Sequence, residues 1–301
     1  MNYRFAVVTT VVTTNPDTIN TAALSIGLLA LLEKIPDDTR KENVHRLRTT
    51  VRRLEVHLPD CPAKIAKSLK RLRKKAGKMR DIDVHLGLLK PPLIPRKSPQ
   101  HDSASEVQSK LRELLKDERE RQVGTLRKLV IEAAPRMRLK LPLLVEHADH
   151  QRTVTAAQAH HTAHRVRQRF MQMTRRIPQD PERLHRLRIN TKNLRYSLEP
   201  LSQFSDCAEL AAHLKQVQDA IGAWHDWATL SEIAAHELKS PEARPVCEAL
   251  KLRTAREYRK ALRTCASVRT WISSPTPAST GDQRHNYRHH NRSLHLIRKA
   301  G

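Results

Sequence analysis

The chain repeats part of its own sequence at a distance of about 140 residues, and this repeat limits the possible folds more than any other feature. Residues 44–58 read VHRLRTTVRRLEVHL, and residues 183–198 read RLHRLRINTKNLRYSL. The tetrapeptide HRLR that starts at His45 therefore returns at His185. Because basic and apolar residues recur in the same order, we infer an internal duplication.

A second pair of matching segments follows the first at a similar distance. Residues 69–89 read LKRLRKKAGKMRDIDVHLGLL, and residues 214–233 read LKQVQDAIGAWHDWATLSEI. Gly77 aligns with Gly222, and an R-D doublet after the first glycine aligns with an H-D doublet after the second. The sequence thus predicts two related halves that share the order of their elements.

We divide the chain according to this repeat. The first half covers about residues 18–100, linker helices cover about 101–150, and the second half covers about 151–271. Residues 1–17 form an N-terminal extension with a β-prone start. Residues 272–301 are rich in Ser, Thr, Pro, His and Arg without apolar periodicity, which predicts a disordered basic tail.

The composition favours an all-α fold. The chain has only 7 Gly in 301 residues, and Leu, Ala, Arg, Lys and Glu are abundant. Aromatic residues make up 3%, too few for the stacking platforms of proteins that read single-stranded nucleic acid. A hydrophobic content of 39% is sufficient for a core.

Apolar periodicity and Pro or Gly interruptions give the expected helices. Val44, Leu47, Val51, Leu54 and Leu58 lie on one side of a helix and predict its buried face. The four prolines in residues 90–100 predict a linker. Gly77 is expected to end a helix. The predicted helices cover about residues 19–34, 40–58, 62–76, 79–90, 102–133, 137–150, 152–177 and 241–271, and the repeat makes the segments 183–198 and 214–233 part of a helical second half.

The charge of the chain indicates a polyanionic partner. The formal net charge is +25 at pH 7, and self-repulsion of this size opposes a compact state. Residues 40–80 alone hold fifteen Lys and Arg against three acidic residues. Nucleic acid, an anionic membrane or an inorganic phosphate polymer would each neutralise such a surface.

Other features narrow the class of protein. The four cysteines form no CxxC pair, which suggests neither a zinc site nor a disulfide framework and fits the reducing cytoplasm. No apolar run reaches the ~18–20 residues that span a bilayer. Phosphate-binding loops, hydrolase and kinase motifs are absent, so no enzyme, metal or cofactor is indicated.

Cationic side chains flank the apolar face in both repeats. On a helical wheel His45, Arg48 and Arg52 lie beside the stripe that Val44 begins. From Leu184 the corresponding residues in the second repeat are His185, Arg188, Lys192 and Arg195. A single stripe of this kind is more often a solvated helix face with snorkelling side chains. Its recurrence in both halves favours a phosphate-binding groove, which Arg73 of the following helix is also expected to face.

The doublets after the glycines have two interpretations. In Arg80-Asp81 and His225-Asp226 the aspartate can orient a neighbouring cation or cap a helix. An H-D doublet also occurs in metal-dependent phosphohydrolases. Because Arg80 stands at the equivalent position in the first half and arginine does not ligate metals, we favour the structural role.

These motifs resemble the CHAD family, the conserved histidine α-helical domains, over about residues 18–271. The resemblance rests on HRLR with its following Arg or Lys, the later LK, the glycine and the R/H-D doublet. It implies two pseudosymmetric antiparallel four-helix bundles around a basic cavity that binds inorganic polyphosphate, with a location on polyphosphate granules. The implied polyphosphate-binding residues are His45, Arg48, Arg52, Arg73, Arg80, His185, Arg188, Lys192, Arg195 and Lys215, supported by Asp81, His225 and Asp226.

The chain also departs from the family pattern. Glu55 stands where the second half has Arg195, and Gln218 replaces Arg73 in the second half, so we expect the first half to contribute most of the binding. We also expect a stand-alone domain without the triphosphate-tunnel domain of many family members. The alternatives are a nucleic-acid binder, a metal-dependent phosphohydrolase centred on His185, His225 and Asp226, and an interaction scaffold built on residues 102–133.

Overall fold

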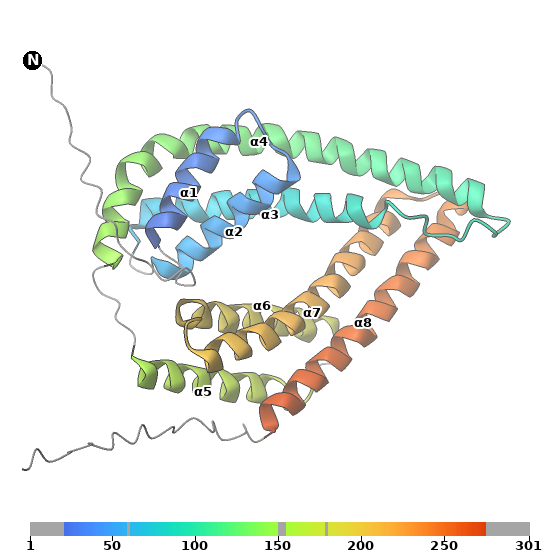
Figure 1. Ribbon diagram of the computed structural model, residues 1–301. Helices are drawn as coiled ribbons and strands as arrows, with labels where there is room; N and C mark the ends of the chain where they lie inside the picture. The colour runs from blue at the N-terminus through green and yellow to red at the C-terminus, as the bar shows by residue number, and fades with distance from the viewer. Residues whose placement is uncertain (1–20, 59–60, 150–154, 178–179, 275–301) are drawn as a thin grey trace, which may run out of the picture.

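The computed structural model describes residues 21–58, 61–149, 155–177 and 180–274, and within these ranges the chain is helical without strands. The predicted all-α class is therefore confirmed. The helices are α1 (Thr21–Lys34), α2 (Lys41–His57), α3 (Ala63–Leu88), α4 (His101–Asp149), α5 (Ala156–Met173), α6 (Pro181–Leu198), α7 (Ser205–Glu237) and α8 (Arg244–Ser273), with short 3-10 turns at Glu199–Leu201 and Pro241–Ala243 (Figure 1).

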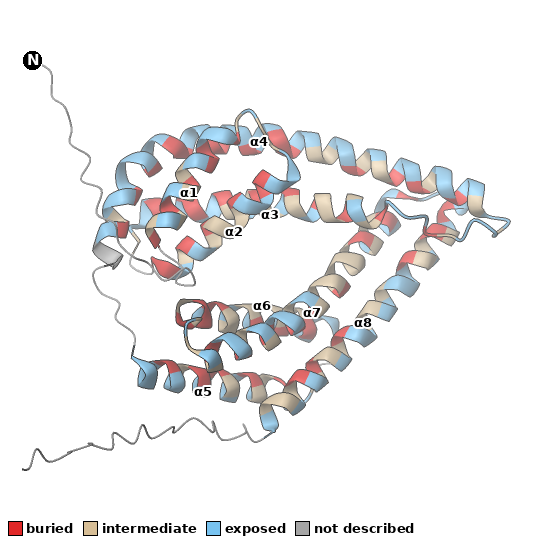
Figure 2. Cartoon of the chain, viewed as in Figure 1, coloured by how far each residue is buried: buried red, intermediate tan, exposed pale blue. Residues whose placement is uncertain are grey.

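Helices α1 to α4 enclose one hydrophobic core. The predicted apolar face of α2 is buried here, with Val44, Leu47, Val51 and Leu54 fully inaccessible to solvent. They pack with leucines of α1 and α3 and with the C-terminal part of α4. Figure 2 shows the buried residues on the inward faces of these helices and the exposed residues on the outside.

Helices α5 to α8 enclose a second core. Phe170 of α5, Leu184 of α6 and Leu210 of α7 are fully buried in it. The start of α6 follows from its sequence, because Pro181 is at the first helical positions and the Asp180 side chain accepts a hydrogen bond from the Glu182 backbone amide at 3.1 Å. This cap fixes the beginning of the helix that carries the second HRLR motif.

A third core joins the two halves. It combines residues from the end of α3 and the start of α4 with the end of α7 and the start of α8. Leu89, Leu111, Leu230 and Leu250 are fully buried there. In Figure 1 the pair α3 and α4 meets the pair α7 and α8 at this end of the molecule, and the rest of each half extends from there.

Two predicted helix boundaries are wrong. Residues 101–149 form the single helix α4 rather than helices near 102–133 and 137–150, and Pro135 and Pro142 lie inside it. A proline removes one backbone hydrogen bond and bends a helix without always ending it. Packing of α4 against α1 and α3 holds the helix together across both prolines, and Figure 1 shows α4 bending along its C-terminal part.

Gly77 does not interrupt a helix either. Helix α3 runs from Ala63 to Leu88 without a break, and Gly222 lies inside α7 in the same way. The aspartates that follow these glycines consequently do not cap new helices. A glycine in a helix interior costs about 1 kcal/mol relative to alanine, which tertiary packing readily offsets.

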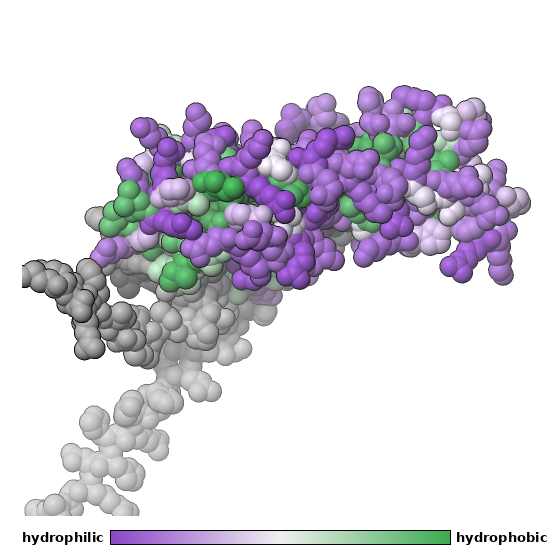
Figure 3. All heavy atoms as spheres, turned by 90° about the horizontal axis from the view of Figure 1, so that it is seen from above, coloured by the Kyte–Doolittle hydropathy of each residue, from purple (hydrophilic) through white to green (hydrophobic). Residues whose placement is uncertain are grey.

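The surface is mainly hydrophilic. Seen from above, the outer face carries hydrophilic residues over most of its area and small groups of hydrophobic ones (Figure 3). No helix in the described ranges has the length and hydropathy needed to cross a membrane. The predicted β-prone segment before α1 and the predicted disordered tail after residue 274 lie outside the described residues.

Candidate functional site

The two halves also meet along the helices that carry the repeated motifs. Helix α2 contacts α6, and α3 contacts α7. Arg52 Nη1 donates a hydrogen bond to Tyr196 Oη at 3.1 Å, which links the first motif to the second. Five basic residues converge here, and we call them the central cationic cluster: Arg48, Arg52, Arg80, Arg188 and Lys192.

The cations of this cluster repel one another and are partly removed from water, which lowers the pKa values of Lys192, Arg48 and Arg188. Burial, together with the charges of Arg52, Arg48 and Arg188, lowers the pKa of Lys192 to about 7. Burial also lowers the pKa of Arg48 to about 10, again with help from Arg52. Arg188 shows the same direction for the same leading cause. Side chains from opposite halves therefore act on one another as like charges.

Most of the cluster forms no direct ion pair among the described residues, although Asp226 and Asp81 attract Arg188 from a longer distance. Among the described residues, no carboxylate lies within 4.0 Å of the cationic groups of Arg48, Arg52, Arg188 or Lys192, all of which are half-buried. The buried Nε of Arg188 has no hydrogen-bond acceptor. Half-buried cations without anions are costly, so this arrangement is suited to an external anion.

The two glycines of the repeat make room for two of these arginines. A methyl group on Gly77 would lie 3.5 Å from Arg48 Nε, and one on Gly222 would lie 3.6 Å from Arg188 Nε. Both distances correspond to van der Waals contact, so each guanidinium rests directly on the neighbouring helix. A larger side chain at either glycine would have to displace the arginine.

Arg80 has partners in both halves. Its Nη1 lies 3.4 Å from the carboxylate of Asp226 on α7 and 3.3 Å from that of the adjacent Asp81. The Arg80–Asp226 pair joins α3 to α7. Both aspartates predicted to have a supporting role contact Arg80, so Arg80 is the member of the cluster that has direct counter-charges.

The three predicted histidines lie around the cluster and are biased toward their neutral form. Burial lowers the pKa values of His45, His185 and His225, and the neighbouring arginines lower them further. The rings of His185 and His225 stack with centroids 4.8 Å apart. Near neutral pH these rings carry an N–H donor without adding to the repulsion.

Arg73 and Arg195 are held by partners at equivalent positions. Arg73 Nε donates to Glu55 Oε2 at 2.5 Å in the first half, and Arg195 Nε donates to Gln218 Oε1 at 3.1 Å in the second. The repeat aligns Glu55 with Arg195 and Arg73 with Gln218, so donor and acceptor have exchanged helices. The two departures from the family pattern therefore compensate within each pair.

Lys215 is placed differently from the other predicted residues. Its side chain is 64% exposed, and its ammonium pairs with Asp219 at 2.5 Å one turn along α7. The structure brings the other predicted residues together around α2, α3, α6 and α7 and leaves Lys215 at the periphery.

Sequence reasoning missed several groups that shape the site. Tyr196 is buried, accepts the hydrogen bond of Arg52, and has the Arg195 guanidinium 4.3 Å from its ring centroid. Glu199 is also buried and binds Arg195 Nη1 at 2.6 Å. An aromatic residue directly after a motif arginine, in a chain with few aromatics, is the signal that could have identified Tyr196.

Metal-binding geometry is not found in the described part of the chain. No group of three or more His, Cys, Asp or Glu side chains is arranged to hold a metal ion there. The carboxylate of Asp226, which a phosphohydrolase would direct at a metal, faces the guanidinium of Arg80 instead.

Comparison with known proteins places this arrangement in a family. The chain is an all-α protein of two four-helix units that share a hydrophobic core at one end and a cation-rich contact along α2 and α6. The sequence matches the CHAD domain family over residues 28–235, and the chain belongs to this family. No curated protein sequence matches it. A similar solved structure is the crystal structure of the CHAD domain from the plant Ricinus communis, with 19% identity, a TM-score of 0.60, and coverage of 88% of this chain and 95% of that chain.

Proposed function

We propose that the chain binds inorganic polyphosphate at the central cationic cluster. The observation that carries the proposal is the group of half-buried cations without carboxylate partners, contributed by α2 in one half and α6 in the other. A linear polyanion placed between these helices contacts both halves at once. Membership of the CHAD family supports the choice of phosphate polymer as the ligand.

Arginine, lysine and histidine side chains contribute to polyphosphate binding in different ways. Guanidinium groups such as Arg48 and Arg188 can donate two hydrogen bonds to one phosphate, which gives directional recognition. Lys192 acts as a compact point charge. The neutral ring of His185 donates a hydrogen bond without increasing repulsion between neighbouring cations.

Binding of the polymer relieves the electrostatic cost of the free site. Each phosphate neutralises cations that are partly removed from water, which lowers their mutual repulsion. The phosphate chain also releases its condensed counterions as the protein neutralises it. We therefore expect affinity to fall steeply as the salt concentration rises.

The experiment compares two double variants in filter-binding titrations with polyphosphate of defined length. Arg48→Ala with Arg52→Ala removes two cluster cations, whereas Arg165→Ala with Arg169→Ala removes two exposed cations from α5. We expect the first pair to weaken binding about a hundredfold, because each lost charge-assisted hydrogen bond contributes at least about 1.5 kcal/mol. Equal losses in the two double variants contradict the cluster as the site.

A competition experiment distinguishes polyphosphate binding from nucleic-acid binding. A net charge of +25 attracts any phosphate backbone, so weak binding of DNA or RNA is expected as well. Polyphosphate should displace a labelled oligonucleotide at a similar phosphate concentration, and the oligonucleotide should fail to displace polyphosphate. The opposite order of displacement favours a nucleic-acid-binding function.

We further propose that the protein acts in the cytoplasm on polyphosphate granules. The four cysteines have no disulfide partner, as expected in a reducing compartment. A tagged chain should then co-localise with polyphosphate stain in cells, and the Arg48→Ala, Arg52→Ala variant should disperse. A variant that remains on the granules contradicts this part of the proposal.

A further inference from the structure

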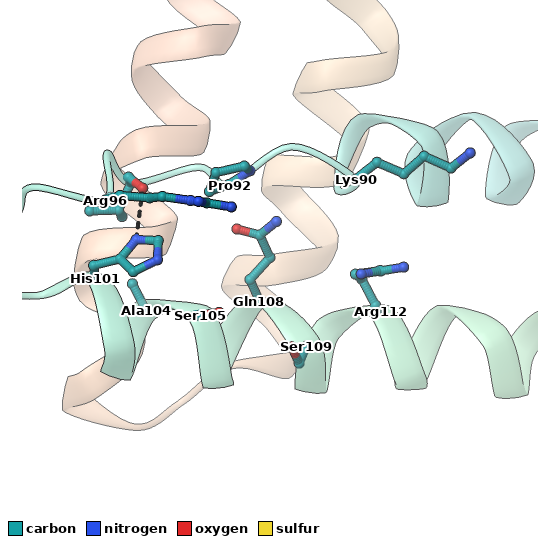
Figure 4. A pocket seen from close by; sticks show the side chains of 10 residues that line it. Lys90, Pro92, Arg96, His101, Ala104, Ser105, Gln108, Ser109 and Arg112 are labelled. Atoms are coloured by element: carbon teal, nitrogen blue, oxygen red, sulfur yellow. Dashed lines mark hydrogen bonds between the residues drawn. The ribbon is translucent and has the colours of Figure 1, made fainter.

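A separate basic cavity lies where α3 passes into α4, and the proposed function leaves it unused. Its volume is about 200 Å³, and it opens to solvent beside the turn between these helices (Figure 4). Its lining comes from the connecting segment and the first three turns of α4: Lys90, Pro92, Ile94, Arg96, His101, Ala104, Ser105, Gln108, Ser109 and Arg112.

Hydrogen bonds from a buried side chain fix the wall of the cavity. Gln108 is buried, and its Nε2 donates to the carbonyl oxygens of Leu89 at 2.8 Å and Pro91 at 2.9 Å. Its Oε1 accepts a hydrogen bond from the Leu93 backbone amide at 2.9 Å. With its polar atoms satisfied in this way, Gln108 holds the connecting segment against α4 and fixes the shape of the cavity.

The charges around the cavity are of one sign. Lys90, Arg96 and Arg112 line it without any acidic residue among its ten lining residues. Within the described part of the chain, none of these three cations has a carboxylate within 4.0 Å. The Nε atom of Arg112 is buried and has no hydrogen-bond acceptor. This N–H group lacks the partner that a buried donor normally has.

Additional donors complete the surroundings. His101 Nδ1 lies 3.2 Å from the Ile94 carbonyl oxygen, so Nε2 is a donor toward an anion only when the ring is protonated. Ser105 and Ser109 offer hydroxyl groups from the same face of α4. In Figure 4 the Arg96 guanidinium lies above the His101 and Gln108 side chains, and Arg112 rises from α4 beside them.

We propose that this cavity is a second anion site that binds a small phosphate group, the size of orthophosphate or pyrophosphate, through Lys90, Arg96 and Arg112. Its volume of about 200 Å³ lies below the ~300 Å³ of typical drug-sized pockets, which matches a small anion better than a long polymer. It admits a free small phosphate or the terminal group of a phosphate chain. Both carry several negative charges on tetrahedral oxygens, which match arginine donors.

The cavity is distinct from the central cationic cluster. The two sites share no residue, and α3 rises about 12 Å between Arg80 and its end at Leu88. The hydrophobic core that joins the halves includes Ile82 and Leu89, from the same stretch of chain. The proposal therefore stands or falls independently of polyphosphate binding at the cluster.

Isothermal titration with pyrophosphate tests the site on the full chain carrying Arg48→Gln and Arg52→Gln, which suppress the central cluster. In this background we expect one pyrophosphate to bind per chain. Adding Arg96→Gln with Arg112→Gln should weaken that binding by about tenfold or more. Absence of binding before these changes overturns the proposal.

A matched control separates a specific site from general charge. Lys97→Gln with Lys110→Gln removes the same charge from exposed neighbours that do not line the cavity, and should change affinity by no more than about twofold. Equal weakening in both double variants overturns the site. Lys90→Gln with Arg96→Gln provides a pair of exposed substitutions in case the change at Arg112 disturbs folding, and it should again weaken binding.

The source of the phosphate follows from comparing orthophosphate, pyrophosphate and tripolyphosphate in the same background. Tighter binding of the two smaller anions identifies a free small phosphate as the ligand. Tighter binding of tripolyphosphate that Arg96→Gln with Arg112→Gln abolishes identifies a chain end. Either order supports the site, whereas binding insensitive to these substitutions contradicts it.

Discussion

The guanidinium of Arg48 rests on the backbone of α3 at Gly77, so close that a methyl group there would lie 3.5 Å from Nε. The conformational freedom of glycine is not needed at this position, because Gly77 lies inside a continuous helix. Its missing side chain is what matters. The glycine lets the side chain of Arg48 on α2 approach α3 closely.

This contact predicts a graded response to substitution at Gly77. Alanine fits at van der Waals distance and should raise the free energy of unfolding by up to about 1 kcal/mol through helix propensity. Leucine should displace Arg48 and weaken polyphosphate binding about tenfold. Titration of both variants, with circular dichroism to verify folding, measures the two effects.

Gly87 supplies the control for this prediction. It lies in the same helix, and a Cβ atom there would meet nothing within 4 Å. Gly87→Leu should leave polyphosphate affinity unchanged. If Gly77→Leu binds as tightly as Gly87→Leu, the position of Arg48 does not depend on the glycine.

The ion pair between Glu55 and Arg73 predicts a gain in affinity when it is broken. Glu55→Gln releases the Arg73 guanidinium and removes a negative charge close to the cluster. We expect polyphosphate to bind about fivefold more tightly, because one more cation becomes available for counterion release. The free energy of unfolding should fall by no more than about 1 kcal/mol, since both side chains are partly exposed.

Glu42→Gln is the matched control, since it removes the same charge from an exposed position on α2. Its effect on affinity should be small. Equal gains in the two variants attribute the effect to net charge rather than to the release of Arg73. A loss of affinity in Glu55→Gln shows that the pair positions Arg73 for binding.

The low pKa of Lys192 predicts that binding depends on pH. Below about pH 7 the ammonium is charged in the free protein, and above it the charge is lost unless a ligand restores it. A polyanion favours the charged form, so affinity should fall as the pH rises from about 6 to about 9, with proton uptake on binding. Titration calorimetry in buffers of different ionisation enthalpy measures this uptake.

Lys192→Arg tests the assignment, because arginine stays protonated over this range. Its affinity should vary much less with pH than that of the unchanged chain. Any pH dependence that remains in Lys192→Arg measures the share of His45, His185 and His225, whose pKa values in the free protein lie below the ordinary 6.5. The same pH profile in both proteins contradicts the role of Lys192.

The hydrogen bond from Arg52 to Tyr196 predicts energetic coupling between the halves. Tyr196→Phe keeps the ring and removes the acceptor, so the free energy of unfolding should fall by about 1 kcal/mol. A double-mutant cycle with Arg52→Ala, followed by urea unfolding, isolates the pair. A coupling energy near zero shows that the bond does not stabilise the contact.

The predictions from sequence succeeded where information is local. Apolar spacing at Val44, Leu47, Val51 and Leu54 identified a buried face, because a helical period depends only on neighbouring residues. The same spacing placed Arg48 and Arg52 beside that face, where the structure finds them half-buried. The motifs also led to the family that the comparison confirms.

The predictions failed where tertiary packing overrides a local signal. Gly77 and Pro135 indicated helix ends, yet both lie inside continuous helices. Local propensity gives the cost of such residues, about 1 kcal/mol for glycine and about 3 kcal/mol for proline. Contacts with neighbouring helices exceed these costs, and their strength is not encoded in any short window of sequence.

The sequence alone thus determined the all-α class, the repeat, and the identity of most cations around the proposed site. Only the tertiary structure showed that Glu55 forms an ion pair with Arg73 and that Asp226 forms one with Arg80 from the other half. It also showed that the pKa of Lys192 is lowered to about 7. The reason is physical. A residue type sets which charges a chain carries, whereas distance and burial, which arise only when helices pack, set how those charges interact.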